Sequence, residues 1–339
     1  MNVQFAIKCA KEYVMEMSAK RKDLVGAYLS GSILTMNLSD ELNPWSDVDV
    51  MLVVSPYNDE NKPGKAIYNN VLIEGSLLDG EILANREQIL SIHYIGYALS
   101  HDSILYDPHG IIQNAQKIIK DEYMKPFWVE NRIDNMINQI KGRILGFDPN
   151  STLPQRVTSY FFTLGISVYP FLLGAGENLT VRKRYSAARH TMEKYGLREL
   201  YDRLLFLLTG GITKEKLLKH MKELEITFDL ACKSHGKSDS YNFRSDISAD
   251  SRRVSIDGTY EIINSDYPQE AVFWMGATFA RCHTVLILDG NESRVEQLLA
   301  FLADLGINDN SDIQERFEEL KKLLPIIKEK SKAMLNICI

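Results

Sequence analysis

Two carboxylates stand one residue apart at the start of an apolar run. Asp47-Val48-Asp49 leads directly into the apolar residues that end at Val54. Because side chains alternate between the two faces of a strand, Asp47 and Asp49 are expected side by side, with Val48 facing the core. Two carboxylates this close repel each other, and a bound cation relieves the repulsion. Mg²⁺ prefers carboxylate oxygens, so we predict that Asp47 and Asp49 are metal ligands.

A glycine–serine pair precedes these acids at the end of another predicted strand. Gly31-Ser32 follows the strand expected at 24–30 and begins a short helical turn. Backbone N–H groups at the start of a helical turn, aided by the helix dipole, bind phosphate groups. Ser30 and Ser46 add hydroxyl groups nearby. We therefore predict that Ser30, Gly31, Ser32 and Ser46 bind the phosphates of a ligand.

Glu74 is the candidate for a third carboxylate. It lies within an apolar strand, where an acid without a partner is costly. Glu74 could complete a three-carboxylate site and accept the proton of an attacking hydroxyl group. Asp79 and Glu81 follow shortly afterwards and compete for this role. The choice between Glu74 and Asp79 stays open at this point.

The elements expected around these residues mix helix and strand. Apolar residues at helical spacing predict a helix over 3–20. The other expected elements are strands at 24–30, 48–54, from 66 or later to 78, and 103–106, with a helix near 81–92. Residues 55–65 are expected to form a surface connection, and Asp107 to form a turn rather than bind metal. Residues 1–122 are thus predicted to be an α+β domain with a small mixed sheet.

The pattern changes at Pro126 to long helical segments. They are expected at 126–146, 154–173, 184–196, 198–209, 213–234, 269–288, 292–304 and 310–335. A polar stretch at 238–268 contains Asp257-Gly258 between short apolar runs, which predicts a hairpin with a type I′ turn. Arg182-Lys183-Arg184 is expected to be a solvated face, with phosphate binding as the alternative. Residues 123–339 are therefore predicted to form an all-helical domain with a polar loop or hairpin at 238–268.

Composition limits the classes of function. A chain of 339 residues predicts two domains, and its net charge of −6 argues against a nucleic-acid partner. No signal-like or bilayer-length apolar run is found, so we expect a cytoplasmic protein without membrane insertion. The four cysteines lack metal-site spacing. The oligomeric state stays open.

The order of the motifs resembles a known superfamily. Tyr28-Leu29-Ser30-Gly31-Ser32, followed by Ser46-Asp47-Val48-Asp49 and its apolar run, is similar to the signature of the DNA polymerase β-like nucleotidyltransferases, with Glu74 matching the third carboxylate. Tyr106-Asp107-Pro108-His109-Gly110 resembles a turn of the antibiotic adenylyltransferase branch. The resemblance covers the chain up to Gly110. The spacer at 33–46 is slightly longer than usual, and Gly75-Ser76 stands where an apolar residue is more usual.

This resemblance implies a nucleotidyltransferase domain at 1–122 and an acceptor-binding helical domain at 123–339. The implied reaction is Mg²⁺-dependent transfer of a nucleoside monophosphate, with AMP from ATP as the expected case. The acceptor would be a hydroxyl group of a small molecule, such as an aminoglycoside-like or lincosamide antibiotic. Asp47, Asp49 and Glu74 would be catalytic, with Glu74 as base. The alternative is a non-catalytic or regulatory nucleotide-binding module of the same fold, as in toxin–antitoxin systems; RNA nucleotidyl transfer is disfavoured by the acidic charge balance.

Overall fold

The structure is a computed structural model that describes residues 1–58 and 62–336. It divides into two compact units. The first contains Met1–Arg132 together with Gly176–Thr180, and the second contains Ile133–Ala175 and Val181–Ile339. The division falls inside the helix α6 (Pro126–Leu145), ten residues beyond the boundary expected from the sequence at 122. A short segment from the middle of the chain therefore belongs to the first unit.

The first unit is built on a five-stranded mixed sheet with the strand order β3-β4-β2-β1-β5. The strands are β1 (Leu24–Ser30), β2 (Val48–Val54), β3 (Gly64–Tyr68), β4 (Val71–Asp79) and β5 (Ile104–Tyr106). β2 and β4 are parallel, and the other neighbouring pairs are antiparallel. The predicted α+β class with a small mixed sheet is confirmed.

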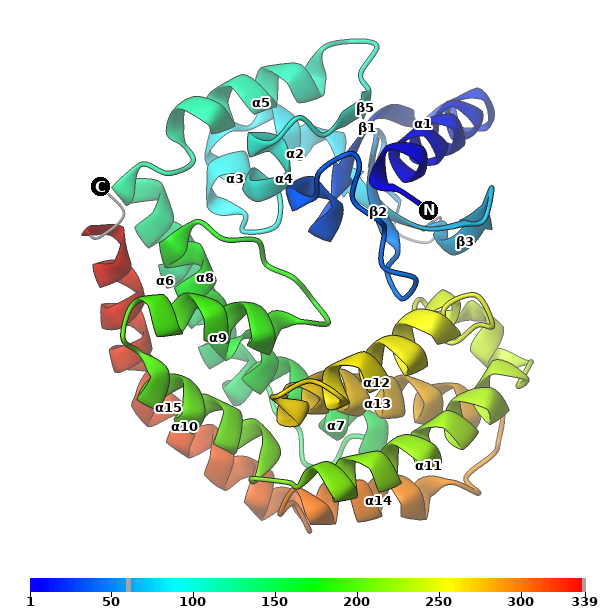
Figure 1. Cartoon of the computed structure of the whole chain (residues 1–339), viewed down its shortest axis with the longest axis vertical. Helices are drawn as coiled ribbons and strands as arrows, with labels where there is room; N and C mark the ends of the chain where they lie inside the picture. Colours follow the sequence, from blue (N-terminus) through cyan, green and yellow to red (C-terminus); the bar gives the residue numbers. More distant parts are fainter. Residues whose placement is uncertain (59–61, 337–339) are drawn as a thin grey trace. The chain divides into compact units, whose positions relative to one another are not determined.

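Helices pack against both faces of this sheet (Figure 1). Helix α1 (Val3–Lys20) contributes to a core with Val48, Val50 and Leu52 on one face. The other face packs Tyr28 and Val53 against α2 (Gly80–Ala84), α3 (Arg86–Ser91), α4 (Gly96–Ser100) and α5 (Ile111–Glu122). Neighbouring residues of one strand thus pack into different cores, because successive side chains of a strand point to opposite faces of the sheet.

Several predicted elements of the first unit are confirmed and others are wrong. The helix at 3–20 and the strands at 24–30 and 48–54 have the expected bounds. The strand expected from 66 or later to 78 corresponds to β4, but its hairpin partner β3 was not predicted; the turn residues Asn69 and Asn70 have φ values of 48° and 65°. Two asparagines allowed this turn without the glycine that usually marks it. The helix expected at 81–92 is interrupted at Asn85, which caps α3, and helices α4 and α5 were not predicted.

In its described part, the second unit has helices and no strand. Beyond α6, the helices are α7 (Leu153–Gly165), α8 (Tyr169–Ala175), α9 (Arg184–Lys194), α10 (Arg198–Thr209), α11 (Lys214–Cys232), α12 (Gly258–Ile263), α13 (Val272–Leu288), α14 (Val295–Asp304) and α15 (Asn310–Ala333). Most residues of α13 are buried, and the helix packs against α7 and α11 (Figure 1). The expected all-helical character of this part of the chain is confirmed.

The hairpin predicted around Asp257-Gly258 is wrong. Residues Arg253–Asp257 form a π-helical turn that continues into α12. Gly258 has a φ of −66°, whereas a type I′ turn needs positive φ at both central residues. Val254, Ile256 and Ile262 are buried, so packing within the unit selects the helical arrangement over the locally plausible hairpin.

Two helical stretches are long and apolar enough to cross a membrane by length and composition alone. They are Leu153–Ala175 and Pro268–Leu288, and their most apolar windows are 83% and 78% buried inside the protein. Core helices of a helical domain show the same combination of apolar composition and burial.

Candidate active site

Four polar residues form one row across neighbouring strands of the sheet. Ser30 of β1 pairs with Asp49 of β2, Asp49 pairs with Glu74 of β4, and Glu74 pairs with Lys65 of β3. Asp47 lies immediately before β2. Residues paired across adjacent strands point to the same face of a sheet. The register therefore places three of the predicted site residues and one lysine side by side.

The three predicted acids converge in the structure. Asp47, Asp49 and Glu74 each present one carboxylate oxygen, and these oxygens lie within 4.8 Å of one another. All three residues are half-buried. Glu74 follows the aspartates by more than twenty positions in the sequence, so only the pairing of β2 with β4 brings it close to them. This donor set, all carboxylate oxygen at close range, fits a hard divalent cation such as Mg²⁺.

Asp79, the competing acid, lies at the other end of the same strands. It pairs with Val54, at the last position of β2. Its side chain accepts a hydrogen bond from the backbone N–H of Glu81 and caps α2. A local structural role therefore accounts for Asp79, and the geometry favours Glu74 as the third carboxylate.

A buried lysine sits among the acids. The Lys65 ammonium group contacts the carboxylates of Asp47 and Glu74, and its side chain is only 4% exposed. Lys62 Nζ lies 3.6 Å from Glu74 Oε1 and is more exposed. Sequence reasoning assigned Lys65 to a surface connection and missed it. Only the β3–β4 pairing places it opposite Glu74.

Burial and the neighbouring charges together shift the pKa of Asp49. Burial raises the pKa of this carboxyl well above its usual range, and the negative charges of Asp47 and Glu74 raise it further. Lys65 and Lys62 lower it in part. The two ammonium groups thus offset the repulsion among the three carboxyl groups only in part, and a bound divalent cation would relieve it further.

Gly31 lies against Asp49 with no space for a side chain. Its φ is +75°, and a Cβ atom built on it would lie 1.9 Å from Asp49 Oδ2. Two separate reasons therefore favour glycine at this position: the left-handed backbone and the close Asp49 carboxylate. The expected helical turn after it is the 3₁₀ turn η1 (Gly31–Thr35), in which Ser32 is exposed. The predicted phosphate-binding turn and the acids are thus direct neighbours.

Ser46 belongs to a separate turn, directly before Asp47. Its backbone N–H donates to the carbonyl of Asn43 over 2.9 Å. Ser30, half-buried, lies in the row next to Asp49. Both predicted serines are therefore adjacent to a site aspartate.

A residue distant in the sequence supports the glycine turn. Asn178 Nδ2 donates to the Gly31 carbonyl over 3.0 Å. Asn178 comes from the segment Gly176–Thr180, which packs as part of the first unit although it follows α8. No local pattern marks this asparagine, so sequence reasoning missed it.

The basic cluster at 182–184 is engaged within the second unit. Arg182 and Lys183 lie 3.6 Å and 3.1 Å from carboxylate oxygens of Glu261. Arg184 is buried, and its guanidinium lies 3.7 Å from the centre of the Phe273 ring. The expectation of a solvated face is wrong for Arg182 and Arg184, whose side chains are largely buried, whereas the Lys183 side chain is 41% exposed.

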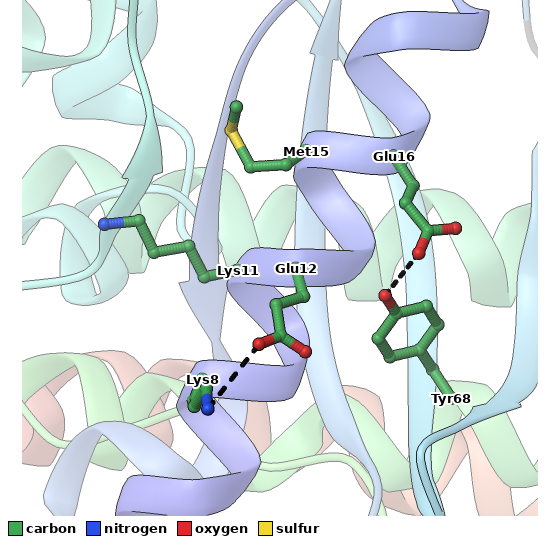
Figure 2. A pocket seen from close by; sticks show the side chains of 6 residues that line it. All are labelled: Lys8, Lys11, Glu12, Met15, Glu16 and Tyr68. Atoms are coloured by element: carbon green, nitrogen blue, oxygen red, sulfur yellow. Dashed lines mark hydrogen bonds and ion pairs between the residues drawn. The ribbon is translucent and has the colours of Figure 1, made fainter.

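A shallow depression on the first unit lies apart from the acids. Figure 2 shows it on α1 and β3, lined by Lys8, Lys11, Glu12, Met15, Glu16 and Tyr68. Four of its polar groups are paired: Lys8 Nζ lies 3.8 Å from Glu12 Oε1, and the Tyr68 hydroxyl donates to Glu16. None of the predicted site residues lines it.

No protein-family model matches this chain, and comparison with curated proteins also gave no match.

Proposed function

We propose that the chain is a Mg²⁺-dependent nucleotidyltransferase that moves a nucleoside monophosphate, AMP from ATP in the expected case, onto a hydroxyl group of a small molecule. One observation carries the proposal: the oxygens of Asp47, Asp49 and Glu74 converge within 4.8 Å directly beside the left-handed Gly31 turn. A metal bound there would supply charge neutralisation for the triphosphate.

Each residue of the site has a separate role in the proposed reaction. Asp47 and Asp49 are the metal ligands, and the turn around Ser30, Gly31 and Ser32, with Ser46, binds phosphate oxygens. Glu74 accepts the proton of the acceptor hydroxyl. The hydroxyl oxygen forms a bond to the α-phosphorus, the bond from that phosphorus to the bridging oxygen breaks, and pyrophosphate leaves. Atoms and charge balance without any further reactant.

Alignment of reactants is the main contribution expected from this site. Residues on neighbouring strands of one sheet are held rigidly, which favours transfer by positioning and by fixed charges. The second unit is the proposed source of acceptor contacts, as the motif resemblance implies. An aminoglycoside-like or lincosamide acceptor is the first class to try.

The test is transfer of label from α-labelled ATP in the presence of Mg²⁺ and panels of aminoglycosides, lincosamides and cell metabolites. Wild-type protein should label an acceptor and release pyrophosphate, whereas Asp47→Asn and Asp49→Asn should not. Asp79→Asn, whose carboxylate caps α2, is the matched acid-to-amide control and should stay active. Both aspartate variants should remain folded, because amidation removes a carboxylate repulsion.

Near-wild-type transfer by Asp47→Asn at saturating Mg²⁺ would overturn the metal assignment. Mg²⁺-dependent nucleotide binding without pyrophosphate release on any acceptor would instead identify a non-catalytic nucleotide-binding module.

A further inference from the structure

Lys65 contacts Asp47, one of the two proposed metal ligands, and Glu74, the proposed base. We infer that Lys65 is a positioning residue that makes metal binding depend on the nucleotide: its ammonium group pairs with Asp47 and Glu74 until a triphosphate arrives and gives it another anionic partner. The inference rests on the proposed function, because it concerns the same site.

The geometry makes the ammonium group and a divalent cation competitors. Lys65 contacts Asp47 and Glu74, two of the three acids whose oxygens lie within 4.8 Å of one another. A metal ion bound to the acids would face the ammonium charge at short range. The Lys65 side chain is 4% exposed, so water screens this repulsion poorly. Withdrawal of the ammonium group from Asp47 is therefore expected to favour metal binding.

A nucleotide changes this balance. Lysine has a flexible four-carbon chain and binds phosphate as a compact point charge. Once triphosphate oxygens lie at the neighbouring Gly31 turn, the displaced ammonium group gains a new anionic partner. Metal and nucleotide then each increase the affinity for the other, and this coupling is reciprocal. The lysine therefore limits binding of free metal by an empty enzyme.

The structure also explains why Lys65 rather than Lys62 has this role. Lys65 lies in register with Glu74 on the adjacent strand and reaches two acids. Lys62 Nζ lies 3.6 Å from Glu74 Oε1, and its side chain is 28% exposed, against 4% for Lys65. Water screens the Lys62 charge more effectively, so its removal should change metal affinity less.

The experiment measures Mn²⁺ binding to the full chain by electron paramagnetic resonance, without nucleotide and without any acceptor. Lys65→Met should bind Mn²⁺ more tightly than wild type, by a factor between about 5 and about 150, the usual range of coupling between two sites. Lys65→Arg, which keeps the charge, should stay near the wild-type affinity. Lys62→Met is the matched control and should show the smaller gain.

A second measurement adds a non-hydrolysable ATP analogue. The analogue should increase Mn²⁺ affinity in every variant, but by a smaller factor in Lys65→Met than in wild type. A purely structural lysine would give the opposite sign in the first measurement, because loosening the site weakens metal binding. If Lys65→Met does not fold, Lys65→Gln, with a polar side chain of similar length, gives the same measurement.

Two failures can be told apart. If Asp47→Asn loses Mn²⁺ binding but Lys65→Met binds no more tightly than wild type, the inference about Lys65 is overturned and the proposed function stands. If wild-type protein binds no Mn²⁺ even with the ATP analogue, the metal site itself is overturned, and both fail.

Discussion

Replacing Gly31 with alanine is expected to damage the site through one added methyl group. Gly31 has a φ of +75°, and the new Cβ atom would lie 1.9 Å from Asp49 Oδ2. Gly110 offers a matched control, because its φ is +70° and a Cβ atom there would meet nothing within 4 Å. Both substitutions carry the backbone cost of alanine in the left-handed region, but only one displaces a site carboxylate.

The magnitudes follow from these distances. The left-handed backbone should cost each variant about 1–2 kcal/mol of stability. Ordinary van der Waals contact begins at 3.4 Å, so in Gly31→Ala the Asp49 oxygen must move from 1.9 Å to 3.4 Å, a shift of about 1.5 Å. A misplacement of about 1 Å can cost ~10²-fold in rate. Gly31→Ala should therefore lose at least about 10²-fold in transfer, and Gly110→Ala should lose little.

The assay compares the two variants in three measurements: urea unfolding, Mn²⁺ binding in the presence of an ATP analogue, and transfer from labelled ATP. The expected result is a similar loss of stability in both and a loss of metal binding and transfer in Gly31→Ala alone. Equal Mn²⁺ affinity in the two variants would refute the reasoning, because the contact between Gly31 and Asp49 would then not determine the site geometry.

Three other predictions concern the proposed base Glu74, the buried Arg132 and the buried His283. Glu74→Gln should lower the transfer rate by ~10²–10⁴ and nucleotide affinity far less, since it loses only the proton acceptor; a collapse in Asp79→Asn with normal Glu74→Gln, measured in single-turnover experiments, would move the base to Asp79. Arg132→Met should reduce the free energy of unfolding by about 2 kcal/mol, because the buried guanidinium donates to two backbone carbonyls; an unchanged urea midpoint would contradict this. His283 is buried, and its pKa is lowered by burial to about 4 from 6.5, so the unfolded chain binds its proton first and stability falls as the pH drops from 6.5 to 4. His283→Phe should remove about 2–3 kcal/mol of that loss in unfolding measured across this pH range; parallel pH profiles for the two proteins would argue against it.

Local patterns were sufficient for much of the first unit. The strand after Asp47 and the strand before Gly31 have the predicted bounds. An apolar run between turn residues indicates a strand from the local sequence alone. The face shared by the aspartates also follows from strand periodicity alone. In the second unit, the long helices were likewise predictable, since helical periodicity repeats over many residues.

Other features could not be read from local pattern. The segment 254–262 has apolar residues compatible with a hairpin, yet it is helical, because its apolar side chains are buried among neighbouring helices. The turn at Asn69-Asn70 lacks the usual glycine signal, so β3, the hairpin partner of β4, was not predicted. In both cases, the competing conformations differ little locally, and packing decides between them.

The sequence by itself determined which residues could do the chemistry: Asp47 and Asp49 by spacing, Gly31 by its place at the end of a strand, and Glu74 as an acid in an apolar strand. Tertiary structure alone decided which of them meet. Parallel pairing of β2 with β4 makes Glu74, and not Asp79, the neighbour of Asp49. Antiparallel pairing of β3 with β4 brings Lys65 opposite Glu74. Asn178 reaches the Gly31 carbonyl from a segment 147 residues away. Strand register and long-range contacts depend on the whole core, because the hydrogen bonds of a sheet join segments whose separation in the chain no local pattern specifies.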